Sequence, residues 1–176
     1  MQRFALLGAG FIGTVHAQNL AAHPGVDFTV VYDVAVDKAA QVAAHHGIRV
    51  APTLEAALDP DVVDAVFIAT STDKHAATLR QAVVAGLAVI CEKPIDLEFA
   101  RAAEVCRYAG RHAARVMMNF NRRFDPDHAE LRRVVASGGV GLVELVHLTS
   151  RGPDVPPWKC LQVSGGQFRD QTVHFF

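Results

Sequence analysis

The sequence is poor in cysteine and carries little excess charge of either sign, and each shortage excludes a class of protein. Three cysteines, Cys91, Cys106 and Cys160, are widely spaced and match no zinc-binding or disulfide pattern, so we expect buried, reduced thiols. Nine histidines are scattered without a His-Glu-x-x-His arrangement, so no metal site is expected. The formal net charge is −1, which provides no basic surface for nucleic acid or anionic lipid.

Long apolar runs are also missing. No stretch of the sequence is long and apolar enough to span a bilayer, so no membrane association is expected. The first apolar stretch, Phe4–Leu7, is too short for the core of a signal peptide, and glycines follow it directly. Hydrophobic residues make up 51% of the chain and charged residues 20%, as in soluble globular proteins, and we expect a cytoplasmic location.

Short apolar runs alternate with Ala-rich segments over residues 1–119, and this alternation predicts an α/β fold with a doubly wound parallel sheet of the Rossmann type. The runs are almost continuously apolar, as strands covered on both faces must be. The predicted strands are Phe4–Leu7, Phe28–Tyr32, Val62–Ala69, Leu87–Ile90 and Val116–Met118. The predicted crossover helices between them are Ile12–Ala22, Val36–His46, Lys74–Ala85 and Glu98–Ala109.

The character of the chain changes after Asn119, and residues 120–176 are interpreted as the beginning of a second domain. Asp125-Pro126 is typical of an N-cap followed by proline in the first helical position. The helix that starts there is expected to end at Gly138-Gly139. The segment Leu142–Thr149 is rich in Val and Leu and is predicted to be a strand.

A glycine-rich turn stands between the first predicted strand and the first predicted helix. Its sequence at residues 8–13, GAGFIG, is a GxGxxG pattern, and the residues expected to bind the cofactor there are Gly8, Gly10, Phe11, Ile12 and Gly13. The first glycine permits the tight turn, the second lets a pyrophosphate approach the backbone, and the third lets helix and strand pack closely. The N–H groups of the helix N-terminus attract the phosphates. The turn therefore predicts a dinucleotide site, whereas an ordinary glycine turn is the alternative.

Asp33 follows the second predicted strand, twenty residues after Gly13. A carboxylate at this position accepts hydrogen bonds from the ribose hydroxyls of NAD and repels the 2′-phosphate of NADP. No arginine follows nearby to offset that repulsion. NAD is therefore the predicted cofactor, and a role for Asp33 as a helix cap is compatible with binding it.

Three further segments carry a family resemblance. They are Cys91-Glu92-Lys93-Pro94, the segment NFNRRFDP at 119–126, and the segment SGGQFRDQTVH at 164–174. Together with the glycine turn, these segments resemble the Gfo/Idh/MocA oxidoreductases over nearly the whole chain. The resemblance implies that the peptide before Pro94 is cis, and that residues 120–176 begin an α+β substrate and oligomerisation domain that is truncated here. A full-length form is expected to be a homo-oligomer.

The resemblance also implies roles for individual residues. Lys93 corresponds to a lysine near the reacting hydroxyl and the nicotinamide, and Asp170 and His174 correspond to the other catalytic residues. Thr70, His75 and Glu92 correspond to positions bordering the nicotinamide half of the cofactor. A histidine in the first turn of a helix is more often structural, and this alternative stays open for His75.

The residue chemistry agrees with these roles. Asp170 and His174 are four residues apart and would share a face of a helix, so the carboxylate could orient an imidazole that accepts a proton. Lys93 could stabilise developing alkoxide character. The resemblance implies an NAD-dependent oxidation of a secondary hydroxyl of a cyclic polyol or sugar, myo-inositol to the ketone. A hexose or sugar phosphate is the alternative substrate, and a non-catalytic NAD-binding module is the alternative function.

Overall fold

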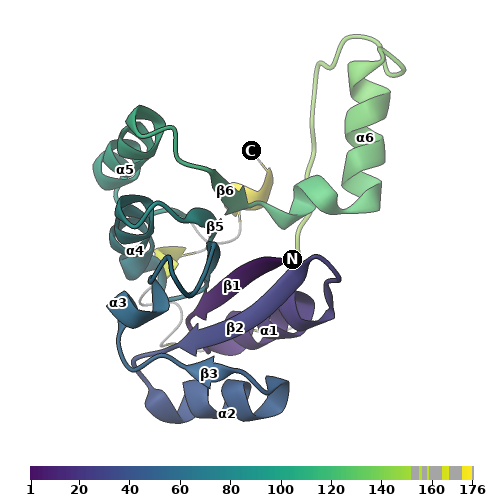
Figure 1. Ribbon diagram of the computed structural model, residues 1–176. Helices are drawn as coiled ribbons and strands as arrows, with labels where there is room; N and C mark the ends of the chain where they lie inside the picture. Colours follow the sequence, from purple (N-terminus) through teal and green to yellow (C-terminus); the bar gives the residue numbers. More distant parts are fainter. Residues whose placement is uncertain (152–154, 156–157, 159–163, 167–171, 176) are drawn as a thin grey trace. The chain divides into compact units, whose positions relative to one another are not determined.

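The computed structural model describes residues 1–151, 155, 158, 164–166 and 172–175. The chain folds into two compact units, Met1–Asn119 and Phe120–Phe176. The first unit contains the whole of the β-sheet, and in Figure 1 it extends from the purple N-terminus through the teal helices.

The sheet of the first unit has six strands, all parallel, in the order β3-β2-β1-β4-β5-β6 (Figure 1). From β1 the chain moves outward through β2 and β3, and then crosses back to place β4 on the other side of β1. This reversal confirms the predicted doubly wound Rossmann fold. The strands are β1 (Gln2–Leu7), β2 (Val26–Tyr32), β3 (Arg49–Val50), β4 (Ala65–Ile68), β5 (Ala88–Glu92) and β6 (Val116–Asn119).

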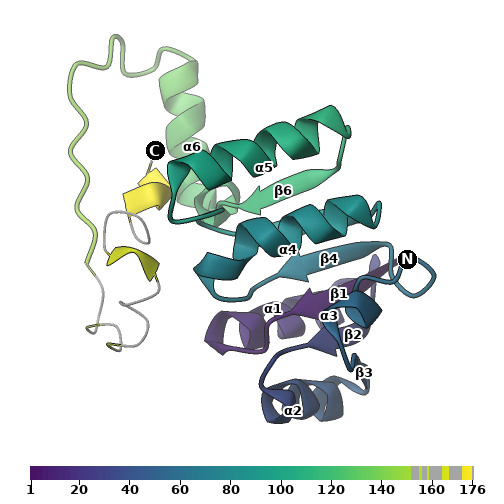
Figure 2. The ribbon, with the colours of Figure 1, turned by 90° about the vertical axis from the view of Figure 1, so that its left-hand side faces the viewer.

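Helices cover both faces of this sheet (Figure 2). On one face, α1 (Phe11–Ala22) and α2 (Val36–His46) bury small apolar side chains such as Ala17 and Ala39 against the strands. On the other face lie α3 (Leu54–Ala57), α4 (Thr72–Val84) and α5 (Phe99–Arg111). Strands sandwiched in this way must be apolar on both sides, which explains the continuous apolar runs in the sequence.

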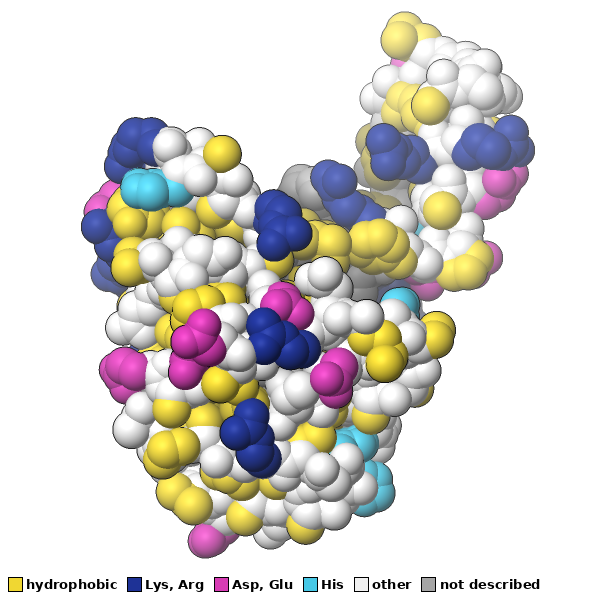
Figure 3. Space-filling model, viewed as in Figure 1, with side chains coloured by type: hydrophobic (Ala, Val, Ile, Leu, Met, Phe, Trp, Pro, Cys, Tyr) yellow, Lys and Arg dark blue, Asp and Glu magenta, His cyan; other side chains and the backbone are white. Residues whose placement is uncertain are grey.

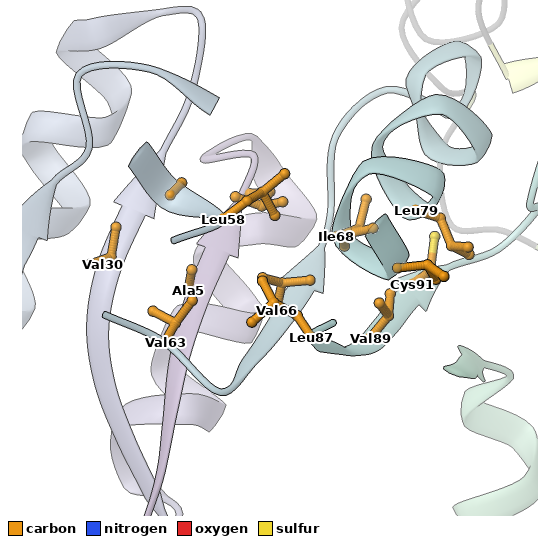
Figure 4. Close-up of a cluster of buried hydrophobic side chains, with 14 of the residues drawn as sticks. Ala5, Val30, Leu58, Val63, Val66, Ile68, Leu79, Leu87, Val89 and Cys91 are labelled. Atoms are coloured by element: carbon orange, nitrogen blue, oxygen red, sulfur yellow. The ribbon is translucent and has the colours of Figure 1, made fainter. Parts of the chain in front are cut away.

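Successive residues of β1 show the period of two that divides the core between the faces. Ala5 and Leu7 contribute to the cluster under α3, α4 and α5, whereas Leu6 contributes to the cluster under α1 and α2. All three side chains are fully buried. Figure 4 shows the first of these clusters, where Leu79 of α4 packs close to Ile68 of β4 and Cys91 of β5.

Two short elements of the first unit were missed by the sequence patterns. β3 has two residues and α3 has four, so neither is long enough to show a periodicity. α3 is nevertheless capped, because the Thr53 hydroxyl accepts a hydrogen bond from Ala56 N–H at 3.2 Å. The predicted strand Val62–Ala69 is shorter in the structure and comprises Ala65–Ile68, because the backbone turns at Asp59, whose carbonyl accepts from Val62 N–H.

The second unit begins with a 3₁₀ helix, η1 (Asn121–Phe124), followed by α6 (Pro126–Ala136). Asp125 caps α6 as predicted, accepting a hydrogen bond from His128 N–H at 3.1 Å. The predicted strand Leu142–Thr149 is wrong, because these residues form neither helix nor strand. A strand needs a neighbour for its backbone N–H and C=O groups, and the described residues after Asn119 form no strand.

The cysteine prediction is correct in one place and wrong in another. Cys91 is fully buried in β5, and burial raises the pKa of its thiol, which stays protonated and is a poor nucleophile. Cys106 is exposed on α5, which contradicts the expected burial, because it lies on the solvent-facing side of an amphipathic helix. Cys160 lies outside the described residues.

The face of the first unit seen in Figure 3 carries acidic and basic side chains interspersed among apolar and neutral ones. Within the described part of the chain, no helix has the length and apolar character needed to cross a membrane. Among the same residues, no group of three or more His, Cys, Asp or Glu side chains is arranged to hold a metal ion.

An ion pair joins β1 to the residue before β4 and gives a testable dependence of stability on pH. Arg3 Nη2 lies 2.6 Å from Asp64 Oδ1, and Arg3 N–H donates to Asp64 Oδ2 at 2.8 Å. The hydrogen bonds from Arg3 lower the pKa of Asp64 from 3.8 to about 2. A lowered native pKa stabilises the fold above the unfolded value, and the contribution is lost as the pH falls through the native value.

We therefore expect Asp64→Asn to lower the free energy of unfolding at neutral pH, with the difference from the parent shrinking as the pH falls from 3.8 towards 2. Urea unfolding at a series of pH values in this range measures the difference. Asp37→Asn, an exposed change in α2, is the control. A difference that stays constant down to the lowest pH would contradict the ion-pair explanation.

Candidate cofactor site

The predicted site residues of the first unit converge at the carboxyl ends of the parallel strands. The glycine turn follows β1, Asp33 follows β2, and Thr70 lies two residues after β4. Glu92 ends β5, with Lys93 directly after it, and Asn119 ends β6. In a doubly wound sheet, ligands bind at this edge where the strand order reverses, here between β1 and β4.

The glycine turn is tightly packed at its two ends and open in the middle. Gly8 has a φ of +102°, and a Cβ there would collide with the carbonyl of Ala69. A Cβ on Gly13 would collide with the Gly8 carbonyl. Above Gly10, in contrast, there is nothing within 4 Å of an added Cβ. This open space, at the start of a helix, is where a pyrophosphate can approach the backbone.

The N-terminus of α1 suits an anion. The N-cap residue is Gly10, so no side chain accepts a hydrogen bond from the first backbone N–H groups of α1. The first turn of the helix also contains no acidic residue. Phe11 and Ile12 point their side chains outward, with exposed fractions of 87% and 40%, so they do not fill the turn. The backbone N–H groups of the first helical turn have no acceptors within the helix itself and can bind phosphate oxygens.

Asp33 links the glycine turn to the end of β2. Its Oδ2 accepts a hydrogen bond from Ala9 N–H at 2.6 Å, and its Oδ1 accepts from Ala35 N–H at 2.7 Å. Each carboxylate oxygen has a second acceptor site that can receive a ribose hydroxyl. Asp33 therefore orients the turn and retains the capacity to bind a ribose, so the residues present fit NAD.

Thr70 and His75 lie on the β4–α4 connection. The Thr70 side chain is half-buried beside the turn, and its hydroxyl donates to the Ser71 carbonyl at 3.4 Å. The His75 ring is 2% exposed, with Nδ1 2.7 Å from the Pro94 carbonyl and Nε2 3.0 Å from the Thr70 carbonyl. These contacts favour the structural alternative for His75, since its ring joins the β4–α4 and β5–α5 connections.

Glu92 has both carboxylate oxygens bound to protein groups, and the side chain is 10% exposed. Oε1 lies 2.7 Å from His16 Nε2 and accepts from Asn119 Nδ2 at 2.6 Å, while Oε2 accepts from Lys93 N–H at 3.2 Å. Burial raises the pKa of Glu92, but these hydrogen bonds outweigh burial and bring the pKa below its ordinary value. Glu92 is therefore an ionised, buried acceptor.

Lys93 directly follows β5 at this edge of the sheet and is half-buried between Glu92 and Pro94. The Lys93-Pro94 peptide bond is cis, as the resemblance implied. The other residues proposed for catalysis belong to the second unit. His174 lies in the 3₁₀ helix η2 (Thr172–Phe175), and Asp170 lies outside the described residues.

His16 was missed by the sequence analysis. It lies three residues after Gly13 on α1, and its ring stacks on Phe67 of β4 with centroids 4.0 Å apart. The available signal was its spacing, which places a polar residue on the same face of α1 as the buried Gly13, Ala17 and Leu20. Its partner Glu92 could not be inferred, because only the tertiary structure brings the end of β5 within reach of α1.

Fold and turn together define a dinucleotide-binding Rossmann domain. The chain belongs to the Gfo/Idh/MocA oxidoreductase family: the family model, described as an oxidoreductase family with an NAD-binding Rossmann fold, matches residues 2–120. The match confirms the family and the cofactor, NAD, that the sequence predicted.

Inositol dehydrogenases are among the similar proteins. An inositol 2-dehydrogenase of Rhizobium meliloti is 41% identical over 176 residues, covering 99% of this chain and 52% of the relative. A myo-inositol 2-dehydrogenase of Thermotoga maritima is 33% identical, with 99% of this chain and 52% of the relative covered. The crystal structure of a myo-inositol dehydrogenase from Corynebacterium glutamicum superimposes with a TM-score of 0.89 at 36% identity, covering 99% of this chain and 52% of the other. The chain thus spans about half the length of these relatives.

Proposed function

We propose that this chain acts in the NAD-dependent oxidation of a secondary hydroxyl on a cyclic polyol, with myo-inositol as substrate and the ketone as product. The observation that carries the proposal is the convergence of the glycine turn, Asp33 and Lys93 on one edge of the sheet. The similarity to inositol dehydrogenases over 99% of the chain supports the choice of substrate.

Each residue proposed for the reaction has a task that its chemistry suits. The turn and Asp33 hold the cofactor, which when bound supplies the acceptor for the hydride that leaves the carbinol carbon. The Lys93 ammonium donates a hydrogen bond to the substrate oxygen and stabilises negative charge as it develops there. His174 removes the hydroxyl proton, and Asp170 orients its imidazole; both assignments rest on the family resemblance.

Residues 120–176 are proposed to begin the domain that binds the polyol.

A second candidate function is an NAD-binding module without turnover. It is favoured by one observation: the described residues after Asn119 form no strand, so they contribute no sheet against which a substrate could be enclosed. Lys93 favours the first candidate, because binding NAD alone requires no such residue.

Calorimetric titration of the folded chain with NAD and NADH, followed by an assay of NAD reduction with myo-inositol, tests the proposal. A chimera in which the second half of the Rhizobium meliloti relative follows residue 176 is assayed in parallel. We expect both proteins to bind the cofactor and only the chimera to turn over. A chimera that binds NAD but reduces it with a hexose and not with myo-inositol would refute the substrate. Absence of binding by folded protein would refute the function.

A further inference from the structure

A buried carboxylate joins three elements of the first unit at the cofactor edge. Glu92 connects the end of β5 to α1 through His16 and to the end of β6 through Asn119. The same carboxylate receives the backbone N–H of Lys93. The side chain is only 10% exposed, so burial together with these contacts directs the carboxylate towards protein groups.

The partners of Glu92 share one property, which is that each can donate a hydrogen bond. The Asn119 amide nitrogen and the Lys93 N–H are donors only, and the His16 ring nitrogen donates in the appropriate tautomer. An ionised carboxylate is an acceptor only, so it satisfies the three at once. A buried charge is costly unless it is fully hydrogen-bonded, and this geometry meets that requirement.

His16 connects Glu92 to α1, the helix that begins at the glycine turn. The imidazole is held between the Phe67 ring and the carboxylate, with side-chain exposed fractions of 12% for His16 and 10% for Glu92. Since His16 lies one helical turn after Gly13, the rigid body of α1 links its position to that of the phosphate-binding N–H groups.

We propose that Glu92 is a positioning residue for the cofactor site: it fixes the glycine turn and Lys93 relative to each other through His16, Asn119 and its own backbone neighbour. The inference rests on the NAD-dependent function proposed above and assigns Glu92 a role other than the cofactor contact implied by the resemblance. Glu92 acts through other residues and does not touch the cofactor.

Exchanging the hydrogen-bond donor and acceptor between positions 119 and 92 tests this role. Asn119→Asp places a second carboxylate against Glu92, where a repulsion between like charges replaces a hydrogen bond. In the double variant Glu92→Gln/Asn119→Asp, the new amide donates to the new carboxylate and to His16, whose neutral ring can accept, while the amide oxygen still receives Lys93 N–H. Glu92→Gln alone is the milder change, because turning the Asn119 amide lets its oxygen accept a hydrogen bond from the new amide group.

NADH affinity is measured by fluorescence titration of the full chain, and folding by circular dichroism and thermal unfolding. We expect Asn119→Asp to weaken NADH binding about tenfold or more, which corresponds to the loss of one charge-assisted hydrogen bond. The double variant is expected to recover to within about threefold of the parent. Glu130→Gln, which changes an exposed ion pair on α6, is the matched control and should leave the affinity unchanged.

The outcomes separate the inference from the proposed function. If Asn119→Asp lowers the melting temperature but keeps the parental affinity, or if the double variant binds no better than Asn119→Asp, the positioning role is wrong. If the parent binds NADH, and Asn119→Asp and the double variant behave as expected, but the chimera oxidises no polyol, only the proposed reaction is wrong. A folded parent that binds no NADH overturns both.

Discussion

Gly10→Ala is expected to weaken NAD and NADH binding roughly ten- to a hundredfold, because forcing an extra methyl group into a close contact costs about 1–3 kcal/mol. The methyl group would occupy the open space above the turn, where the pyrophosphate must approach the backbone. The protein itself should tolerate the change. Gly10 has φ −75° and ψ −170°, which alanine adopts freely, and the free energy of unfolding should stay within about 1 kcal/mol of the parent.

Calorimetry and urea unfolding measure the two quantities. Gly110→Ala, a matched change in α5 with nothing near the added Cβ, should leave cofactor affinity unchanged. Gly13→Ala provides the contrast, because its Cβ would collide with the Gly8 carbonyl and destabilise the fold itself. Parental NADH affinity in Gly10→Ala would show that the phosphates do not bind over this turn.

Lys93→Met is expected to lower turnover of the chimera with myo-inositol by roughly a hundred- to a thousandfold, the usual cost of removing one donor that stabilises charge in the transition state. Methionine keeps most of the length and apolar character of the side chain and removes only the ammonium group. Binding of NADH should change by no more than about threefold, since the backbone N–H of Lys93 still reaches Glu92.

Steady-state measurement of NADH production, together with fluorescence titration, separates the loss of chemistry from the loss of binding. Lys38→Met, which removes an exposed lysine from α2, should leave both quantities unchanged. Turnover in Lys93→Met within tenfold of the parent would mean that another group polarises the substrate oxygen.

The local patterns predicted those parts of the fold that local physics controls. The predicted helix Val36–His46 matches α2 residue for residue, and Gly47, with a φ of +68°, ends it. Asp125 was predicted as a cap and acts as one. The predicted strand at 142–149 failed because apolar, β-branched composition favours a strand only where a neighbouring strand is present.

The same distinction between local and distant contacts separates the site residues that the sequence predicted from those that it did not. The glycine turn and Asp33 were found because the spacing of a turn between strand and helix is fixed by the backbone over a few residues. The interior positions of Glu92 and His75 were not found, since their partners are distant in sequence: Glu92 is bound by His16 and Asn119, and His75 contacts the Pro94 carbonyl.

The sequence by itself determined the alternation of strands and helices, the phosphate-binding turn and the acidic residue after β2, because backbone geometry and side-chain periodicity act between near neighbours. Only the tertiary structure decided which side chains face the cofactor edge and which face inward. The parallel order β1-β4-β5-β6 places the end of β5 within reach of His16 on α1, and Glu92 therefore accepts a hydrogen bond from His16. Contacts of this kind depend on how layers pack, which no short segment of sequence encodes.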